Sequence, residues 1–230
     1  MKEIKILHLF PRLLSLYGEY GNIAALKAAL EEKGCAVAVT ECESGNASFE
    51  DYDFIYVGSG TEDNLAIALQ RLLPHKESIA AAIRNKLWLA TGNAMALFGK
   101  TLAGKTALGI FDYGTAIDDK RYLGDVLAQD QTLGFINTSC RYQGIENPML
   151  QLVLNKNLGN DKASAAEGVQ EGNFYGTQLI GPFLAKNPHY LAKMVSLLTG
   201  ESYTPDPNGY GCKAYAVALS ELGKRVNLAD

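Results

Sequence analysis

One corner of the sequence has the local pattern of a site for nucleophilic chemistry, at Thr91-Gly92-Asn93. The apolar run at 87–90 before it is typical of a buried strand, and residues 94–99 after it resume with helical spacing. Corners of this kind lie at the carboxyl ends of strands in open α/β sheets, where ligands bind and where a strained elbow often holds a nucleophile. Neither cysteine nor serine, the usual nucleophiles, stands at this corner.

A second corner of small residues, Gly58-Ser59-Gly60, ends the apolar run at 53–57 and precedes Thr61, a residue that caps helices. Glycines at such corners let the backbone approach a ligand closely. Two corners at strand ends predict one cleft. We expect five residues of the corners to line it: Gly58, Ser59, Gly60, Gly92 and Asn93.

Other residues that could carry the chemistry have no recognisable partner. Thr91 and Cys140 are alternative nucleophiles, but the sequence shows no recognisable catalytic base for either. The three histidines are each expected to have a structural role (His8, His75 and His189). The four cysteines show no metal-ligand spacing and predict free thiols (Cys35, Cys42, Cys140 and Cys212). We therefore expect no metal and no cofactor.

The segment 99–106 matches the phosphate-loop pattern GxxxxGK[ST], with Lys105 and Thr106 at its end. A phosphate loop needs a strand before it and a helix after it, because the helix N-terminus binds the phosphates. Here a helical segment precedes the pattern and a strand-like run at 107–111 follows it. An ordinary turn is the preferred interpretation, and a nucleotide site is the alternative.

The elements that must position the corners alternate between strand and helix, which predicts a parallel sheet. Strands are expected at 4–10, 36–40, 53–57, 87–90, 107–111 and 174–180. Helices are expected from Asn22 as N-cap to Gly34, from Thr61 to Pro74, and at 79–84, 188–198 and 213–225, with Asn187 capping the fourth. Antiparallel strands are expected at 113–170. The sequence predicts a three-layer α/β/α sandwich with a mostly parallel central sheet and some antiparallel strands.

Size and composition set further limits. The chain has 230 residues with 47% hydrophobic and 20% charged content, which predicts one globular domain over 1–230. A net charge of −4 argues against binding to the nucleic-acid backbone. No apolar run approaches the ~20 residues of a membrane span, and no signal peptide is recognisable. We expect a cytoplasmic protein.

Several separated motifs, taken together in this order, resemble class I glutamine amidotransferase-like domains of the cobyric acid synthase (CobB/CobQ) type. The nearest resemblance is to the glutaminase subunits of lipid II isoglutaminyl synthases. The motifs are Leu16-Tyr17-Gly18-Glu19-Tyr20-Gly21-Asn22, Gly58-Ser59-Gly60-Thr61-Glu62-Asp63, Arg121-Tyr122-Leu123-Gly124-Asp125, Gly134-Phe135-Ile136-Asn137-Thr138, and Tyr175-Gly176-Thr177-Gln178-Leu179-Ile180-Gly181-Pro182 with Lys186-Asn187-Pro188. The resemblance implies a flavodoxin-like core.

The chemistry of that family needs a cysteine thiolate, a histidine and oxyanion-binding N–H groups. Anchored on Leu97-Phe98-Gly99, the family's Cys-Gly-Gly falls on Gly92-Asn93-Ala94, and its histidine falls on Ile180. The resemblance therefore implies the fold without the catalytic pair, and a non-catalytic ligand-binding or partner subunit. An active glutaminase serving peptidoglycan or cobyric-acid-type amidation remains the alternative.

The resemblance also implies a ligand and a partner. Arg121 is expected to pair with the carboxylate of a small amino-acid-like ligand, and Asn137 and Gln178 to add hydrogen bonds. The implied partner is a Mur-ligase-like or other ATP-dependent synthetase subunit.

Overall fold

The protein is described from a computed structural model, in which residues 2–226 are placed. A six-stranded sheet forms its centre, in the order β11-β12-β4-β3-β1-β2. Five of its strands are parallel, and β11 alone runs antiparallel. The strands are β1 (Glu3–Leu9), β2 (Ala36–Cys42), β3 (Phe54–Val57), β4 (Leu87–Thr91), β11 (Val169–Glu171) and β12 (Phe174–Thr177). The expected mostly parallel sheet is confirmed.

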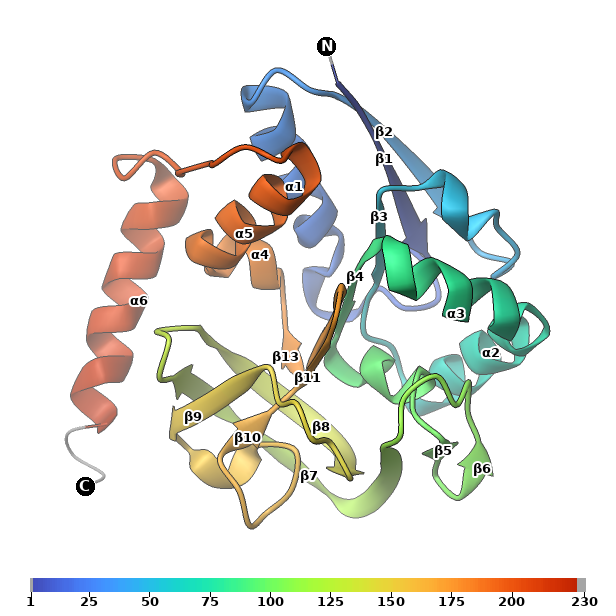
Figure 1. Ribbon diagram of the computed structural model, residues 1–230. Coiled ribbons are helices and arrows are strands. Elements are labelled where there is room, and N and C mark those ends of the chain that lie inside the picture. The colour runs from blue at the N-terminus through green and yellow to red at the C-terminus, as the bar shows by residue number, and fades with distance from the viewer. Residues whose placement is uncertain (1, 227–230) are drawn as a thin grey trace.

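Helices cover both faces of this sheet (Figure 1). One face packs against α1 (Tyr20–Glu32), α4 (Phe183–Lys186) and α5 (Pro188–Thr199). The other packs against α2 (Glu62–Leu72) and α3 (Lys76–Asn85). Strand β4 shows why both faces must be covered, because Trp88 and Ala90 enter one core while Leu87 and Leu89 enter the other. The three-layer α/β/α fold is confirmed.

A second, mainly antiparallel sheet packs beside the first and carries the long helix α6 (Tyr210–Val226) along its outer edge (Figure 1). Its main feature is the hairpin of β7 (Gly114–Ala128) and β8 (Leu133–Gln143). The other strands are β5 (Thr101–Leu102), β6 (Lys105–Thr106), β9 (Leu150–Leu154), β10 (Ala166–Glu167) and β13 (Leu179–Ile180). Antiparallel strands within 113–170 are thus confirmed. Every helix within residues 2–226 is too short or too polar to cross a bilayer.

Two expectations around the first corner are wrong. Residues 94–99 do not form an α-helix, because the chain turns through a 3-10 helix, η4 (Gly92–Leu97). The run at 107–111 is not a strand, since the N–H groups of Leu108 and Ile110 donate to the carbonyls of Leu97 and Phe98 at the end of η4. The other 3-10 turns are η1 (Leu16–Gly18), η2 (Phe49–Asp51), η3 (Leu73–His75) and η5 (Lys156–Leu158).

The phosphate-loop pattern at 99–106 forms a small hairpin. Strands β5 and β6 pair antiparallel across a turn in which Ala103 and Gly104 both have positive φ. No helix follows the pattern, so its N–H groups are not arranged around a helix N-terminus. The preferred interpretation as a turn is confirmed.

The helix ends at Thr61 and Gly34 agree with the sequence, whereas α1, α3 and α6 begin before the expected positions. Thr61 caps α2 by accepting from the Asn64 N–H at 3.2 Å, and Gly34 follows α1 with a φ of 79°. Helix α1 begins earlier than expected, at Tyr20, and Asn22 lies buried in its first turn. Its amide accepts from Leu184 N and donates to the Tyr56 hydroxyl, both at 2.8 Å. Asn22 therefore joins α1 to α4 and β3 instead of capping a helix.

Asn187 precedes α5 as expected, but its side chain serves the second sheet. The buried amide accepts from Leu133 N at 2.9 Å and donates to the carbonyls of Leu133 and Phe183, both at 3.0 Å. We expect Asn187→Ala to lower the free energy of unfolding by about 2 kcal/mol, because it removes three buried hydrogen bonds and takes the side-chain acceptor away from the Leu133 N–H. Urea denaturation measures the change. The exposed Asn85 gives the control Asn85→Ala, and equal losses in both variants would contradict the expectation.

Candidate functional site

The corner after β4 has the backbone of an elbow without its nucleophile. Gly92 adopts a φ of 62°, a left-handed conformation that costs a residue with a side chain roughly 1–2 kcal/mol. A Cβ atom placed on Gly92 would lie 3.1 Å from Ile180 Cγ2. The two positions that the resemblance assigns to the catalytic pair thus face one another, and they carry no thiol and no imidazole.

The space between these positions is filled. The same Cβ atom on Gly92 would lie only 2.5 Å from both Cβ and Oγ of Ser59. Ser59 is buried and belongs to the neighbouring corner after β3. A side chain at 92 therefore requires Ser59 to move, and no open cleft separates Gly92 from Ile180.

Asn93 ties the two corners together. Its Oδ1 accepts from the Ser59 hydroxyl at 3.2 Å and from the Gly60 N–H at 3.1 Å, while its Nδ2 donates to the Gly60 carbonyl at 2.8 Å. The sequence motif around Gly60 resembles the oxyanion-side corner of the amidotransferase-like family. In this chain the Gly60 N–H is already used within the protein, so it is not available to an oxyanion.

A cavity of about 220 Å³ lies beside the two corners. It is smaller than the roughly 300–1,000 Å³ of drug-sized ligand sites and suits a small polar molecule. Five residues expected at a ligand site line it: Ser59, Gly60, Asn93, Arg121 and Asn137. The remaining walls are Leu16, Tyr17, Thr61, Glu62, Thr138 and Ser139. We call this space the corner cavity.

Arg121 reaches the corner cavity from β7 and is held by one residue of α2 and one of β8. Its Nη2 donates to Glu62 Oε1 at 2.9 Å and its Nη1 to Asn137 Oδ1 at 3.1 Å. Asn137 in turn donates to the Tyr17 hydroxyl at 3.1 Å. An exposed ion pair of this kind adds little to stability, but it orients a guanidinium that has five N–H donors. The remaining donors suit a carboxylate.

Three expected residues lie elsewhere. Gly92 lies against Ser59. Gly58 is closely packed, because a Cβ atom placed on it would lie 2.9 Å from the Leu14 carbonyl oxygen. Gln178 is fully buried, with its N–H donating to Glu167 Oε1 at 2.6 Å. None of the three lines the corner cavity. Gln178 is remote because β12 ends at Thr177 and the chain then crosses to pair with β8.

A buried carboxylate behind the corner was not expected from the sequence. Glu19 is fully buried and accepts from the hydroxyls of Tyr56 and Thr91, and its Oε1 accepts from Gly181 N at 3.1 Å. Burial raises the pKa of Glu19 from 4.5 to about 7, against the lowering effect of these hydrogen bonds and of the Lys186 charge. The Glu19 cluster thus ties the start of α1 to β3, β4 and the Gly181 turn.

Sequence signals for these missed residues existed. Tyr17 and Glu19 stand in the first motif of the resemblance, at 16–22, and Glu62 stands in the second, at 58–63. Gly21, in the same first motif, is needed for close packing, since a Cβ there would lie 2.7 Å from Pro182 Cβ. The motif therefore marks where α1 meets the Gly181 turn.

The alternative nucleophiles are poorly placed. Thr91 is 0% exposed, and its hydroxyl is bonded to Glu19 and Tyr56. Cys140 is buried, and burial raises its pKa above the ordinary thiol value, which keeps it protonated at neutral pH. Both side chains therefore lack the access or the charge that attack on an amide requires.

The histidines lie apart from the corner cavity. Burial lowers the pKa of His8 to about 4, so its ring is neutral where it packs on Tyr56. His189 Nε2 lies 2.9 Å from Thr132 Oγ1, and His75 ends η3. Within residues 2–226, no three His, Cys, Asp or Glu side chains come together as a metal site.

Comparison with known proteins identifies two relatives among curated sequences. The chain is 28% identical over 220 residues to the lipid II isoglutaminyl synthase (glutamine-hydrolyzing) subunit GatD of Streptococcus pneumoniae, covering 89% of this chain and 84% of that protein. It is 28% identical over 198 residues to the corresponding Staphylococcus aureus subunit, covering 81% of each. A search of protein-family profiles finds no match.

Among solved structures, the glutaminase domain of Trypanosoma brucei CTPS has a similar fold. Its TM-score is 0.52 at 11% identity, and the match covers 87% of this chain and 96% of that domain. At 11% identity, this similarity shows the fold alone. The chain is thus similar in sequence to GatD subunits and similar in fold to a glutaminase domain, in keeping with a glutamine amidotransferase-like fold.

Proposed function

We propose that this chain is a non-catalytic, GatD-like glutamine amidotransferase-type subunit that acts by binding. The observation that carries the proposal is the filled space between Gly92 and Ile180, where Ser59 stands in place of an open cleft. Glutamine hydrolysis requires a nucleophile, a base and oxyanion donors. At the matching positions this chain has a glycine, an isoleucine and an N–H that is bonded to Asn93.

The ligand we propose is a small amino-acid-like carboxylate in the corner cavity. Arg121 is oriented by Glu62 and Asn137, and the hydroxyls of Tyr17 and Ser139 stand close by. A carboxylate would bind by charge-assisted hydrogen bonds from the Arg121 guanidinium, in competition with Glu62.

The partner we propose is a Mur-ligase-like or other ATP-dependent synthetase subunit. The relatives are named as subunits of a glutamine-hydrolysing lipid II isoglutaminyl synthase, which supports a role within a larger enzyme for this chain too. Peptidoglycan amidation is the reaction context that follows from this likeness.

Ammonia release from glutamine tests the absence of catalysis. The purified chain is expected to release no ammonia above the buffer rate, with or without a candidate synthetase, because no side chain at the corner can attack the amide. Release that is abolished by Cys140→Ser or by Thr91→Val would contradict the proposal and favour an active glutaminase.

Thermal unfolding tests the ligand. Glutamate or glutamine at concentrations well above its dissociation constant is expected to raise the melting temperature by a few degrees, since a ligand that binds only the folded state stabilises it. Arg121→Met should remove the shift. The exposed Arg84 of α3 provides the control Arg84→Met, which should keep it. Equal shifts in both variants would rule out Arg121 as the carboxylate contact.

A further inference from the structure

Helix α6 lies on the second sheet without burying any of its residues fully. Helix α5, by comparison, buries Tyr190, Met194, Val195 and Leu198. A row of small residues lies on one face of α6 and lines the space beside the helix: Gly211, Ala214 and Ala218, at the spacing i, i+3 and i+7. Their short side chains leave space between the helix and the elements beneath it.

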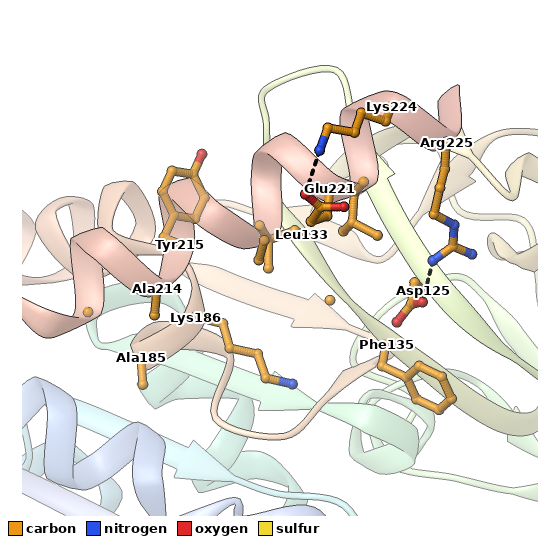
Figure 2. Close-up of a pocket in the computed structure, with 14 residues that line it drawn as sticks. Asp125, Leu133, Phe135, Ala185, Lys186, Ala214, Tyr215, Glu221, Lys224 and Arg225 are labelled. Carbon is orange, nitrogen blue, oxygen red and sulfur yellow. Dashed lines mark hydrogen bonds and ion pairs between the residues drawn. The ribbon is translucent and has the colours of Figure 1, made fainter. Parts of the chain in front are cut away.

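That space is a cavity of about 720 Å³, which lies within the roughly 300–1,000 Å³ typical of small-molecule sites. We call it the helix cavity; its walls are mostly apolar and come from α4, α6, β7 and β8 (Figure 2). The apolar walls are Leu133, Phe135, Ala185, Ala214, Ala218 and Leu222, with Tyr215 at one end. It shares no lining residue with the corner cavity.

The charged side chains around the helix cavity are mostly paired with one another. Arg225 Nη1 lies 2.5 Å from Asp125 Oδ2, and Lys224 Nζ lies 2.6 Å from Glu221 Oε1 (Figure 2). Lys186 differs from them. Its ammonium donates to the Ile180 carbonyl at 3.3 Å, and no carboxylate among residues 2–226 lies within 4.0 Å of it.

Lys186 is partly withdrawn from water. It extends from the end of α4 into the space between α6 and β8 (Figure 2). Burial lowers its pKa, while the more distant Glu19 and Asp125 charges act in the opposite direction. An ammonium with spare N–H donors beside apolar walls favours an anion at its end of the cavity, because the anion restores the lost solvation.

We propose that the helix cavity binds a small anionic amphiphile, a molecule with an apolar chain or ring and a single carboxylate. The apolar part would lie along Leu133, Phe135 and the small-residue face of α6. The carboxylate would accept from Lys186 Nζ. Charge complementarity selects this class over a neutral or cationic apolar molecule, since the other cations of the site already have carboxylate partners.

Titration calorimetry with octanoate and octan-1-ol tests the proposal, with displacement of the fluorescent naphthalene sulfonate ANS as a second readout. Octanoate is expected to bind, and octanol to bind at least about 10-fold more weakly, because it lacks the charge-assisted hydrogen bond to Lys186. Lys186→Met should weaken octanoate binding by about the same factor and leave octanol unaffected.

Two further variants make the result specific. Lys213→Met, on the exposed side of α6 and outside the cavity, should bind octanoate as the wild type does. Ala218→Trp fills the cavity and should abolish binding of both probes, provided its circular dichroism and melting temperature show a folded protein. Absence of octanoate binding, equal affinities for octanoate and octanol, or an unchanged affinity in Lys186→Met would overturn the proposal.

Discussion

The Glu19→Gln variant is expected to gain stability relative to the wild type, measured as the free energy of unfolding, as pH rises from about 4.5 to about 7. Between these values the folded wild type still holds the Glu19 proton, whereas the unfolded chain has released it. The stabilisation that this proton gives the folded protein is therefore fully present below the pKa of Glu19 in the unfolded chain. It is lost as pH rises through the pKa of Glu19 in the folded protein. Glutamine has no such proton, so the loss is confined to the wild type.

The size of the effect follows from the pKa shift. A change from 4.5 to about 7 corresponds to on the order of 3 kcal/mol by linkage. Urea denaturation of both proteins at several pH values measures the difference in the free energy of unfolding. His8, whose pKa is lowered to about 4, changes stability in the opposite sense over part of this range, but it is present in both proteins and cancels.

A matched control separates the buried carboxylate from a general effect of charge. Glu50 is exposed, so Glu50→Gln should follow the wild type at every pH. Glu167 is buried and has a pKa that burial raises to about 7, so Glu167→Gln should behave like Glu19→Gln. A difference between Glu19→Gln and wild type that stays constant from pH 4.5 to 7 would contradict the expected titration of Glu19.

The sheet and its helices could be predicted because their signals are local. Strands β1, β3 and β4 are short apolar runs, and α2 carries both a cap and an apolar stripe. The run at 107–111 misled for the same reason. Its residues are apolar like those of a strand, yet their N–H groups satisfy the carbonyls at the end of η4, a contact set by tertiary structure.

The site was predicted less well, because side-chain direction depends on neighbours distant in sequence. Asn93 stands at the expected corner, but two of its three hydrogen bonds join it to Gly60, 33 residues away. Glu19 stands in a sequence motif, but only the fold brings Tyr56 and Thr91 around it. Gln178 lies inside the run expected as one strand at 174–180, but β12 ends at Thr177 and the chain continues as β13 in the second sheet.

Four substitutions together are expected to install glutamine hydrolysis in this chain: Ser59→Gly, Gly92→Cys, Asn93→Gly and Ile180→His. Each removes one obstacle. Gly92→Cys supplies the nucleophile on a backbone that already has a φ of 62°, and Ile180→His places a base opposite it. Ser59→Gly clears the position 2.5 Å from the new Cβ, and Asn93→Gly releases the Gly60 N–H for the oxyanion.

Omitting one substitution at a time shows whether this account of the site is right. Without Asn93→Gly the rate of ammonia release should fall by about 10²–10³-fold, the usual effect of losing one oxyanion donor. Without Ser59→Gly the protein should be less stable by roughly 1–3 kcal/mol, because the cysteine side chain overpacks the corner. The same set with Gly92→Ala is the control that keeps the geometry but has no thiol, and it should be inactive. If Gly92→Cys and Ile180→His alone hydrolyse glutamine as fast as all four changes, then neither Ser59 nor Asn93 blocks the corner, and the cysteine and histidine are sufficient for hydrolysis.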